Sequence, residues 1–239
     1  MNIAVIFAGG VGTRMKSHDI PKQFLKMHGK PIIIHTLELF EKHTQIDFIV
    51  VACVEEWIST LWDMVKNYHL NKVQMIVPGG STGQLSIYNG LKAAESLAGD
   101  SKAAVLIHDG VRPLINEKVI SDNIESVEIH GSAITSTPVK ETLMVVNEDN
   151  SINYIPSREH SRIAKAPQSF WLKDILETHE QALKDGLDNF IDSCTMMQYY
   201  GKSLYLVDGP NENIKITTPD DFFMMRALID AKEDTQFMI

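Results

Sequence analysis

Short apolar runs that alternate with helical patterns limit the fold of this chain more than any other feature of its sequence. The runs lack the polar alternation of a sheet with one wet face, which is typical of parallel strands covered by helices on both sides. We therefore expect one α/β domain over residues 1–239, built on a doubly wound, mostly parallel sheet. Strands are predicted at 2–8, 47–54, 72–77 and 103–109, and helices at 31–43, 55–68 and 82–97.

The alternation breaks once, between about 138 and 170. There the segment PVKETLMVVNEDNSINYIPSR predicts two short strands around the polar turn NEDNS. A hairpin inserted late in an α/β sheet often projects from it, so we expect a β-hairpin arm at about 138–162. We further expect the arm to reach a partner subunit, which would make the chain a homodimer.

Composition limits the kinds of partner and the cellular location that we expect for this chain. The chain is 44% hydrophobic and 22% charged, as in ordinary globular proteins, and its net charge of -9 argues against nucleic acid. No apolar run approaches the roughly 20 residues that cross a bilayer, so no membrane contact is expected. Two cysteines, Cys53 and Cys194, are too few for a disulfide framework. These features together predict a cytoplasmic protein.

The stretch AVIFAGGVGTRM runs the first predicted strand into a loop with three glycines. Such glycines allow consecutive N–H groups to line a phosphate. The loop matches neither the Walker pattern GxxxxGK[ST] nor the dinucleotide pattern GxGxxG, because methionine stands at the third glycine position of the latter. The remaining interpretations are a glycine loop assisted by the cations Arg14 and Lys22, or a turn with solvated charges.

Two further stretches place charged residues near the same edge of the sheet. VLIHDGVRP ends a predicted strand with Asp109 and places Arg112 three residues later. An acid at the carboxyl end of a strand is well placed to meet a magnesium ion that carries substrate phosphates. NIKITTPDDF puts Lys215 in a short β-like run, before a helix that a capping box opens at Thr218. The cap is structural, but Lys215 has no structural explanation.

Together these motifs resemble a known family. GGxGTRM, PKQFL, the paired glycines followed by Ser86, IHDGVRP, PVKET, SR at 157 and 158, APQ and NIKIT occur in this order along nearly the whole chain. The chain is similar to the CTP-dependent sugar-alcohol phosphate cytidylyltransferases, which include the methylerythritol phosphate enzyme of isoprenoid synthesis and the ribitol-5-phosphate enzyme of teichoic acid and capsule synthesis. The resemblance implies a Rossmann-like nucleotidyltransferase fold and an enzyme that transfers a cytidylyl group from CTP to a polyol phosphate.

The resemblance implies a CTP site around the first strand. Arg14 and Lys22 are similar to the pair that holds the CTP phosphates and the transition-state charge, and Asp109 to the acid near the ribose and Mg²⁺. The other CTP-binding residues implied are Ala8, Gly9, Gly10, Gly12, Gly80 and Ser86, the last two at the cytosine.

The resemblance also implies an acceptor site. The residues that would bind the acceptor's phosphate are Arg112, Thr142, Arg158 and Lys215. Because Thr142 and Arg158 lie on the predicted arm, a neighbouring subunit would supply them. Lys215 is also implied to reach the α-phosphate, which counts it among the catalytic cations. The attacking phosphate is already anionic at neutral pH, so the reaction needs no strong general base.

Three departures from the methylerythritol pattern bear on the acceptor. Ala166 and Ile191 stand where those enzymes carry threonines, and Gly83 stands where an arginine is common. Missing hydroxyl groups should weaken recognition of methylerythritol phosphate. DGVRP and GGSTGQ resemble the ribitol-phosphate branch, which implies D-ribitol 5-phosphate as acceptor and CDP-ribitol and pyrophosphate as products. The methylerythritol phosphate enzyme is the nearest alternative. A nicotinamide-dependent reductase and a catalytically silent nucleotide-binding module are the alternatives from other classes.

Overall fold

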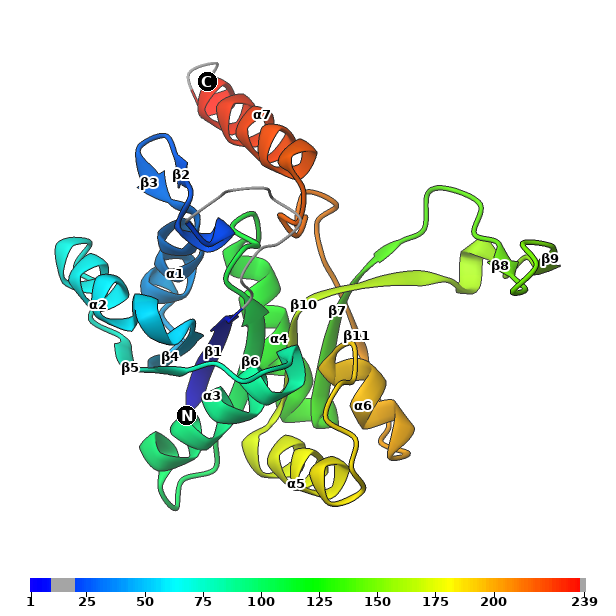
Figure 1. Ribbon diagram of the computed structural model, residues 1–239, viewed down its shortest axis with the longest axis horizontal. Coiled ribbons are helices and arrows are strands. Elements are labelled where there is room, and N and C mark those ends of the chain that lie inside the picture. The colour runs from blue at the N-terminus through cyan, green and yellow to red at the C-terminus, as the bar shows by residue number, and fades with distance from the viewer. Residues whose placement is uncertain (10–19, 237–239) are drawn as a thin grey trace.

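A seven-stranded sheet runs through the centre of the computed structural model, which describes residues 1–9 and 20–236 (Figure 1). Its order is β11-β7-β10-β6-β1-β4-β5. β1 is parallel to β4 and β6, β4 to β5, and β7 to β11, whereas β10 is antiparallel to both its neighbours. The strands span Asn2–Ala8 (β1), Phe48–Cys53 (β4), Val73–Pro78 (β5), Ala104–Asp109 (β6), Ser132–Pro138 (β7), Arg162–Trp171 (β10) and Leu206–Asp208 (β11).

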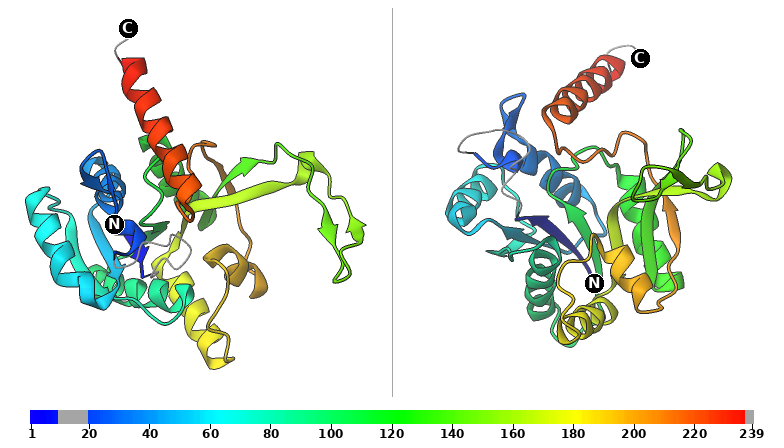
Figure 2. Two further views of the ribbon diagram at one scale, coloured as in Figure 1. Left: turned by 45° about the horizontal axis from the view of Figure 1, so that its top comes forward. Right: turned by 45° about the vertical axis from the view of Figure 1, so that its right-hand side comes forward.

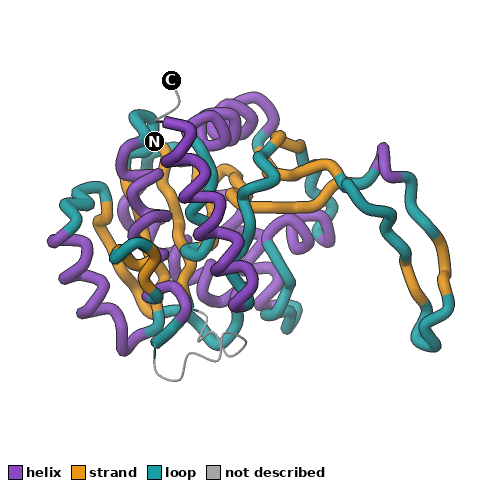
Figure 3. The backbone as a smooth tube through the Cα atoms, turned by 90° about the horizontal axis from the view of Figure 1, so that it is seen from above, coloured by secondary structure: helices purple, strands orange, loops and turns teal. Residues whose placement is uncertain are grey.

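Helices cover both faces of this sheet (Figures 2 and 3). On one face, α1, α2 and α4 share a core that includes the fully buried Phe40 and Leu61. On the other face, α3, α5 and α6 share a core that includes Leu91 and Ile175. The prediction of a doubly wound α/β fold is therefore confirmed. The helices span Ile32–Lys42 (α1), Ile58–Asn67 (α2), Gly83–Ala98 (α3), Glu117–His130 (α4), Leu172–Lys184 (α5) and Ser193–Tyr199 (α6).

Local sequence sets where these helices begin. The Thr82 hydroxyl accepts a hydrogen bond from the Leu85 amide (3.1 Å), which starts α3 with a side-chain cap. Asn116 caps α4 in the same way, and Asp192 caps α6. The helix predicted over 55–68 instead begins with a 3₁₀ turn, η3 (Glu55–Trp57), ahead of α2. The strands predicted at 2–8, 47–54, 72–77 and 103–109 and the helices predicted at 31–43 and 82–97 differ from the structure only by small shifts at their ends.

The C-terminal helix α7 (Pro219–Gln236) begins at the predicted capping box, which is confirmed. The Asp221 carboxylate accepts hydrogen bonds from the amides of Thr217 (2.8 Å) and Thr218 (2.7 Å). The NIKIT run before this helix was expected to be β-like, but it forms no strand. It lies against the loop after β6 instead, where the Ile216 amide donates to the Val111 carbonyl (3.1 Å). Neither α7 nor another helix within residues 1–9 and 20–236 is long and apolar enough to cross a bilayer.

The segment between β7 and β10 projects from the body as an arm in every view (Figures 1–3). It carries the short antiparallel strands β8 (Val145–Val146) and β9 (Ile152–Tyr154) around the turn NEDNS, which the Asn147 amide closes on the Ser151 carbonyl (2.9 Å). The 3₁₀ turn η4 (Arg158–His160) leads back to β10. The predicted hairpin arm is confirmed, and its contact with a second subunit stays a prediction.

Candidate active site

Asp109 lies at the centre of a charged cluster at the carboxyl end of β6. Its Oδ1 is 2.6 Å from Lys215 Nζ, and its Oδ2 accepts a hydrogen bond from Arg112 Nε at 2.7 Å. Only 7% of the Asp109 side chain is exposed. Burial alone would raise the pKa of this carboxyl, but the charges and hydrogen bonds of Lys215 and Arg112 lower it to about 2. Asp109 is therefore an anion throughout the physiological range.

Each of the two cations makes a further contact outside its ion pair with Asp109. Arg112 also donates from Nη1 to the Asn213 carbonyl (2.9 Å), so the guanidinium joins the loop after β6 to the segment before α7. The Asn213 side chain donates to the Ala166 carbonyl (2.6 Å), which ties the same segment to β10. Lys215, two residues along, lies with its Nζ 5.6 Å from the centre of the Phe7 ring. The two cations that contact Asp109 thus come from the loop after β6 and from the segment before α7, which is itself tied to β10.

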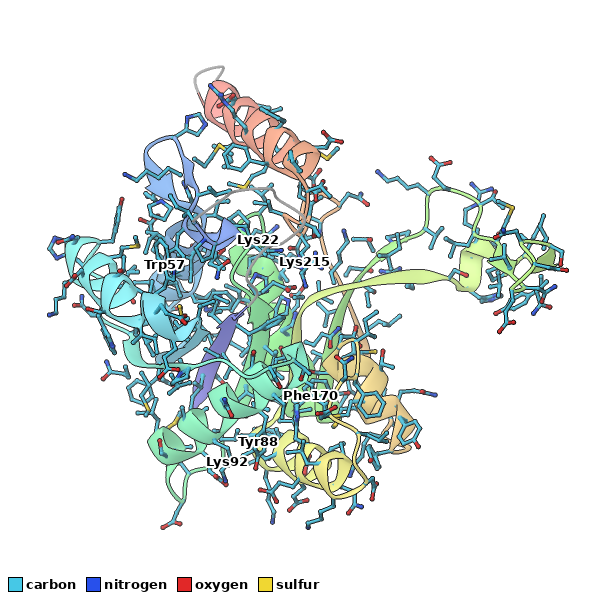
Figure 4. The ribbon with its side chains drawn as sticks, viewed as in Figure 1. Lys22, Trp57, Tyr88, Lys92, Phe170 and Lys215 are labelled. Carbon is cyan, nitrogen blue, oxygen red and sulfur yellow. The ribbon has the colours of Figure 1, made fainter. Side chains whose placement is uncertain are left out.

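Lys22 lies close to this cluster. It begins the short 3₁₀ turn η2 (Lys22–Phe24), and its Nζ donates to the Ile216 carbonyl (2.9 Å), beside Lys215. The next residue, Gln23, is buried and donates to the Ala8 carbonyl (2.6 Å) at the end of β1. Figure 4 labels Lys22 and Lys215 close together above the carboxyl end of the sheet. Both lysines line the same cavity.

This first cavity, of about 500 Å³, brings together most of the residues that sequence reasoning assigned to CTP. The Ser86 hydroxyl accepts a hydrogen bond from the Gly80 amide (3.0 Å) and donates to the Thr82 carbonyl (2.9 Å). A Cβ at Gly9 would lie 2.8 Å from Ser86 Oγ, so a larger residue after β1 would displace the Ser86 hydroxyl. The predicted residues that line the cavity are Ala8, Gly9, Lys22, Gly80, Ser86, Asp109 and Lys215.

A second cavity, of about 360 Å³, lies on the other side of the cluster. It shares the residues Phe7, Gly83, Asp109 and Lys215 with the first cavity. Arg112, Ala166 and Ile191 also line the second cavity, and Ile191 is 89% exposed. A Cβ at Gly83 would meet no atom within 4 Å, so packing does not require glycine at this position. Two cavities therefore meet at Asp109 and Lys215.

Sequence reasoning missed several polar residues of the second cavity. Lys165 comes just before Ala166, and burial, followed by the charge of Arg112, lowers its pKa. Gln168 belongs to the quoted motif APQ, so that motif could have signalled it. The other missed polar residues of this cavity are Gln84, His179, Asp192 and Ser193. His179 has no sequence signal, because only the packing of α5 against α3 brings it to the cavity.

Not every predicted site residue comes together in one chain. Thr142 and Arg158 are exposed on the arm and line neither cavity. Arg158 is held within the arm, where its Nη1 donates to the Lys140 carbonyl (3.3 Å). Gly10, Gly12 and Arg14 lie outside the described residues.

The donor set around Asp109 limits how a metal could bind. Across residues 1–9 and 20–236, the structure contains no group of three His, Cys, Asp or Glu side chains that could hold a metal ion. A single permanently ionised carboxylate at the meeting point of two cavities suits a divalent cation that takes its other ligands from phosphates and water. The residues present therefore fit a magnesium ion that arrives with a nucleotide, rather than a closed protein site.

Comparison with known proteins gives a consistent result along the whole chain. The family model described as 2-C-methyl-D-erythritol 4-phosphate cytidylyltransferase matches residues 2–231. A ribitol-5-phosphate cytidylyltransferase of Streptococcus agalactiae is 55% identical over 236 residues, covering 99% of this chain and 98% of the relative. Another protein of that description, from Vibrio parahaemolyticus, is 52% identical and covers 99% of both chains. A 2-C-methyl-D-erythritol 4-phosphate cytidylyltransferase of Clostridium novyi is 39% identical and covers 96% of both.

Solved structures agree with the fold. The crystal structure of 4-diphosphocytidyl-2C-methyl-D-erythritol synthase from Anaerococcus prevotii superposes with a TM-score of 0.83 at 27% identity, covering 96% of both chains. The 2-C-methyl-D-erythritol 4-phosphate cytidylyltransferase of Thermus thermophilus gives a TM-score of 0.74 at 28% identity, covering 95% of this chain and 98% of the other.

Proposed function

This chain belongs to the 2-C-methyl-D-erythritol 4-phosphate cytidylyltransferase family, whose model spans residues 2–231, and we propose that it transfers the cytidylyl group of CTP to D-ribitol 5-phosphate. The predicted cytidylyltransferase family is confirmed, so the reductase and the silent binding module are set aside. The acceptor is the proposed element. It is supported by the full-length relatives named ribitol-5-phosphate cytidylyltransferases, at 55% and 52% identity.

The observation that carries the proposal is the meeting of two cavities at one charged cluster. A transfer between two substrates needs a nucleotide site and an acceptor site that share the reacting phosphorus. Asp109 and Lys215 line both cavities, while Gly80 and Ser86 line only the first and Arg112 only the second. We therefore assign CTP to the first cavity and the acceptor to the second, with the α-phosphate at the junction.

The chemistry follows from charge and position. An oxygen of the acceptor's phosphate monoester attacks the α-phosphorus of CTP, a new phosphorus–oxygen bond forms, and the bond to pyrophosphate breaks. Such transfers are accelerated mainly by alignment and by positive charge near the developing negative charge. Lys22 and Lys215 are assigned this role, because both line the first cavity and are anchored near each other through the Ile216 carbonyl and Asp109. Arg112 is assigned to the acceptor's phosphate.

Asp109 is proposed to bind Mg²⁺ together with the CTP phosphates. Its low pKa, about 2, keeps it a hard anionic oxygen ligand at every pH at which the enzyme would work. When bound, the ion would supply charge neutralisation on the phosphates. The same carboxylate orients Lys215 and Arg112 through its two oxygens, so Asp109 also fixes the geometry of the cations.

Departures at the acceptor cavity support ribitol 5-phosphate over methylerythritol phosphate. Ala166 and Ile191 both line that cavity and present no hydroxyl group there. A site that recognises a hydroxyl by a hydrogen bond discriminates strongly, whereas an apolar wall discriminates weakly. Methylerythritol phosphate stays the second candidate, because the Clostridium novyi relative with that name is 39% identical.

A homodimer through the arm is proposed to complete the acceptor site. An isolated two-stranded hairpin is marginally stable, and a group of exposed apolar side chains marks an interaction surface. Thr142 and Arg158 would then reach the acceptor of a second subunit. The exposed apolar side chains of the arm are Leu143, Met144, Val145, Val146, Ile152, Tyr154 and Ile155. The cytoplasm is proposed as the location, since CTP is available there.

Pyrophosphate release with a panel of acceptors tests the proposal. The measurement is kcat/KM at saturating CTP and Mg²⁺ for ribitol 5-phosphate, other five-carbon polyol phosphates and methylerythritol phosphate. We expect the five-carbon linear polyol phosphates to lead, with ribitol 5-phosphate first. A highest value for methylerythritol phosphate would replace the proposed acceptor. Absence of pyrophosphate release with every acceptor would refute the proposed reaction.

A further inference from the structure

Two polar side chains at the second cavity have no hydrogen-bond partner. His179 of α5 is 1% exposed and Ser193 of α6 is 4% exposed, and both line the cavity that Arg112 and Lys215 also line. Within the described part of the chain, neither ring nitrogen of His179 nor the Ser193 hydroxyl oxygen makes a hydrogen bond. Buried polar atoms are nearly always paired, because an unpaired one costs free energy. These three atoms are therefore candidates for contact with a ligand.

The glutamines of this cavity are already engaged by the protein. Gln84 donates to the Leu187 carbonyl (2.9 Å) and accepts from the Phe190 amide (2.7 Å). Gln168 donates to the Asp192 carboxylate (3.0 Å). These contacts fix the loop between α5 and α6 and leave those amide groups committed to the fold. Unlike the glutamine side chains, the polar atoms of the His179 and Ser193 side chains have no hydrogen-bond partner in the described part of the chain.

The hydrogen-bonding character of His179 suits an uncharged hydroxyl group. Burial lowers its pKa to about 4, so the ring is neutral near pH 7 and offers one N–H donor and one nitrogen acceptor. Its ring packs beside Tyr88 of α3, with the centroids 5.8 Å apart, and Figure 4 labels Tyr88 where α3 and α5 meet. The Ser193 hydroxyl can likewise donate and accept. A phosphate would instead favour cations, which this cavity gathers as Arg112, Lys165 and Lys215.

We propose that His179 and Ser193 form a hydroxyl-recognition subsite for the polyol chain of the acceptor and determine its specificity. The inference rests on the proposed function, because it assigns the acceptor to the second cavity. The phosphate lies at Arg112 and Lys215, and the hydroxyl groups far from the phosphate pair with His179 and Ser193. The subsite supplies hydrogen-bonding groups that Ala166 and Ile191 do not. A linear polyol phosphate satisfies it, whereas a shorter acceptor leaves its polar atoms unpaired.

Ser193→Ala and His179→Phe test the subsite, with Cys194→Ala as the matched control beside it, since Cys194 does not line the cavity. We expect kcat/KM for ribitol 5-phosphate to fall about 10-fold in either variant, the scale of a lost hydrogen bond to a substrate hydroxyl. The KM of CTP should stay unchanged. Glycerol 3-phosphate, which is too short to reach the subsite, should lose less than 2-fold. Cys194→Ala should resemble the wild type with both acceptors.

Thermal unfolding separates recognition from a structural role. Without acceptor, Ser193→Ala should unfold at or above the wild-type temperature, because it removes a buried hydroxyl that lacks a partner. Ribitol 5-phosphate should raise the unfolding temperature of the wild type more than that of either variant, since a ligand of the native state stabilises it by mass action. A lower unfolding temperature combined with equal losses for both acceptors would show that the side chains serve only the fold.

The outcomes keep the subsite and the proposed function apart. Suppose that the wild type releases no pyrophosphate, but ribitol 5-phosphate stabilises it in a way that depends on His179 and Ser193. This result would refute the proposed reaction and support the subsite. Rapid turnover in the wild type and values within 2-fold in both variants would overturn the subsite alone. Neither turnover nor stabilisation in the wild type would overturn both.

Discussion

The carboxyl end of β6 and the arm hold charged residues in opposite ways. At β6, Asp109 is buried between Arg112 and Lys215, each within 2.7 Å, so these charges have fixed partners inside one chain. On the arm, Thr142 and Arg158 are exposed, and the arm also carries exposed apolar side chains. The first region is organised by its own fold. The second region has the composition of a surface that becomes organised only against another molecule.

The two regions would therefore recognise the two substrates in different ways. The charges that we assign to CTP and to the reacting phosphorus come from the edge of the sheet, where pre-organisation would favour the transition state. The residues assigned to the acceptor's phosphate come partly from a projecting element. Assembly of the dimer would then control use of the acceptor more than binding of CTP.

Loss of a lysine at the sheet edge is expected to have the largest effect. Lys215→Ala and Lys22→Ala should each keep the fold and lower turnover by about 100-fold or more, the scale for removal of one preorganised charge. The measurement is kcat for pyrophosphate release at saturating substrates. Lys202→Ala, which removes an exposed lysine on the surface, is the matched control and should retain wild-type turnover. Near-normal turnover in Lys215→Ala or Lys22→Ala would remove that lysine from the mechanism.

An arm variant should affect the acceptor and spare CTP. Arg158→Ala would remove the charged contact to the acceptor's phosphate that we propose, so we expect the KM of ribitol 5-phosphate to rise about 10-fold or more, with the KM of CTP near its wild-type value. Arg158→Lys should recover part of the loss, because it restores the charge but not the planar guanidinium. Equal increases in the KM of both substrates would contradict the division between the two regions.

Mixed dimers test directly whether the arm of one subunit completes the site of the other. Mixing Arg158→Ala with Asp109→Ala should restore activity, because one site of a mixed dimer combines an intact sheet edge with an intact arm. Mixing Lys215→Ala with Asp109→Ala is the control and should restore none, since both changes lie at the same sheet edge. Sedimentation of each mixture must show dimers. Recovery in neither mixture would place Arg158 in the site of its own chain or outside the site altogether.

The sequence predicts the functional residues at the sheet edge better than those in the walls of the cavities. Asp109 is predictable because a buried apolar run ends on it, and the carboxyl ends of parallel strands share one edge. The hairpin arm is predictable from two short runs around a polar turn. His179 and Ser193 are not, because a helix face becomes a cavity wall only when α3, α5 and α6 pack together. The apolar alternation at Lys215 predicts β structure, but Ile214 and Ile216 pack against α7 instead of pairing with a strand.

A smaller effect is expected on the free energy of unfolding at acid pH, to which the sheet edge and the arm should contribute differently. His108 of β6 is fully buried, and burial lowers its pKa to about 4, despite a hydrogen bond from its Nε2 to the Arg112 carbonyl (3.0 Å). In the unfolded chain, His108 therefore becomes protonated near pH 6.5, whereas in the folded chain it becomes protonated only near pH 4. Stability is complete above pH 6.5 and falls as the pH drops toward 4, by up to about 3 kcal/mol for this histidine. His179, whose pKa burial also lowers to about 4, acts in the same window.

His108→Gln keeps a donor for the Arg112 carbonyl but removes the titrating ring. We expect the slope of unfolding free energy against pH, measured by urea unfolding between pH 4 and 6.5, to lose about 1.4 kcal/mol per pH unit. His160→Gln on the arm is the matched control. The His160 ring is exposed, so this variant makes the same substitution outside the core. The ionisation of Asp109 does not change the slope between pH 4 and 6.5. Its lowered pKa means that Asp109 contributes stability above about pH 3.8, and this contribution is lost only as the pH falls through about 2. Equal slopes in His108→Gln and the wild type would mean that the folded protein protonates His108 as readily as the unfolded chain does.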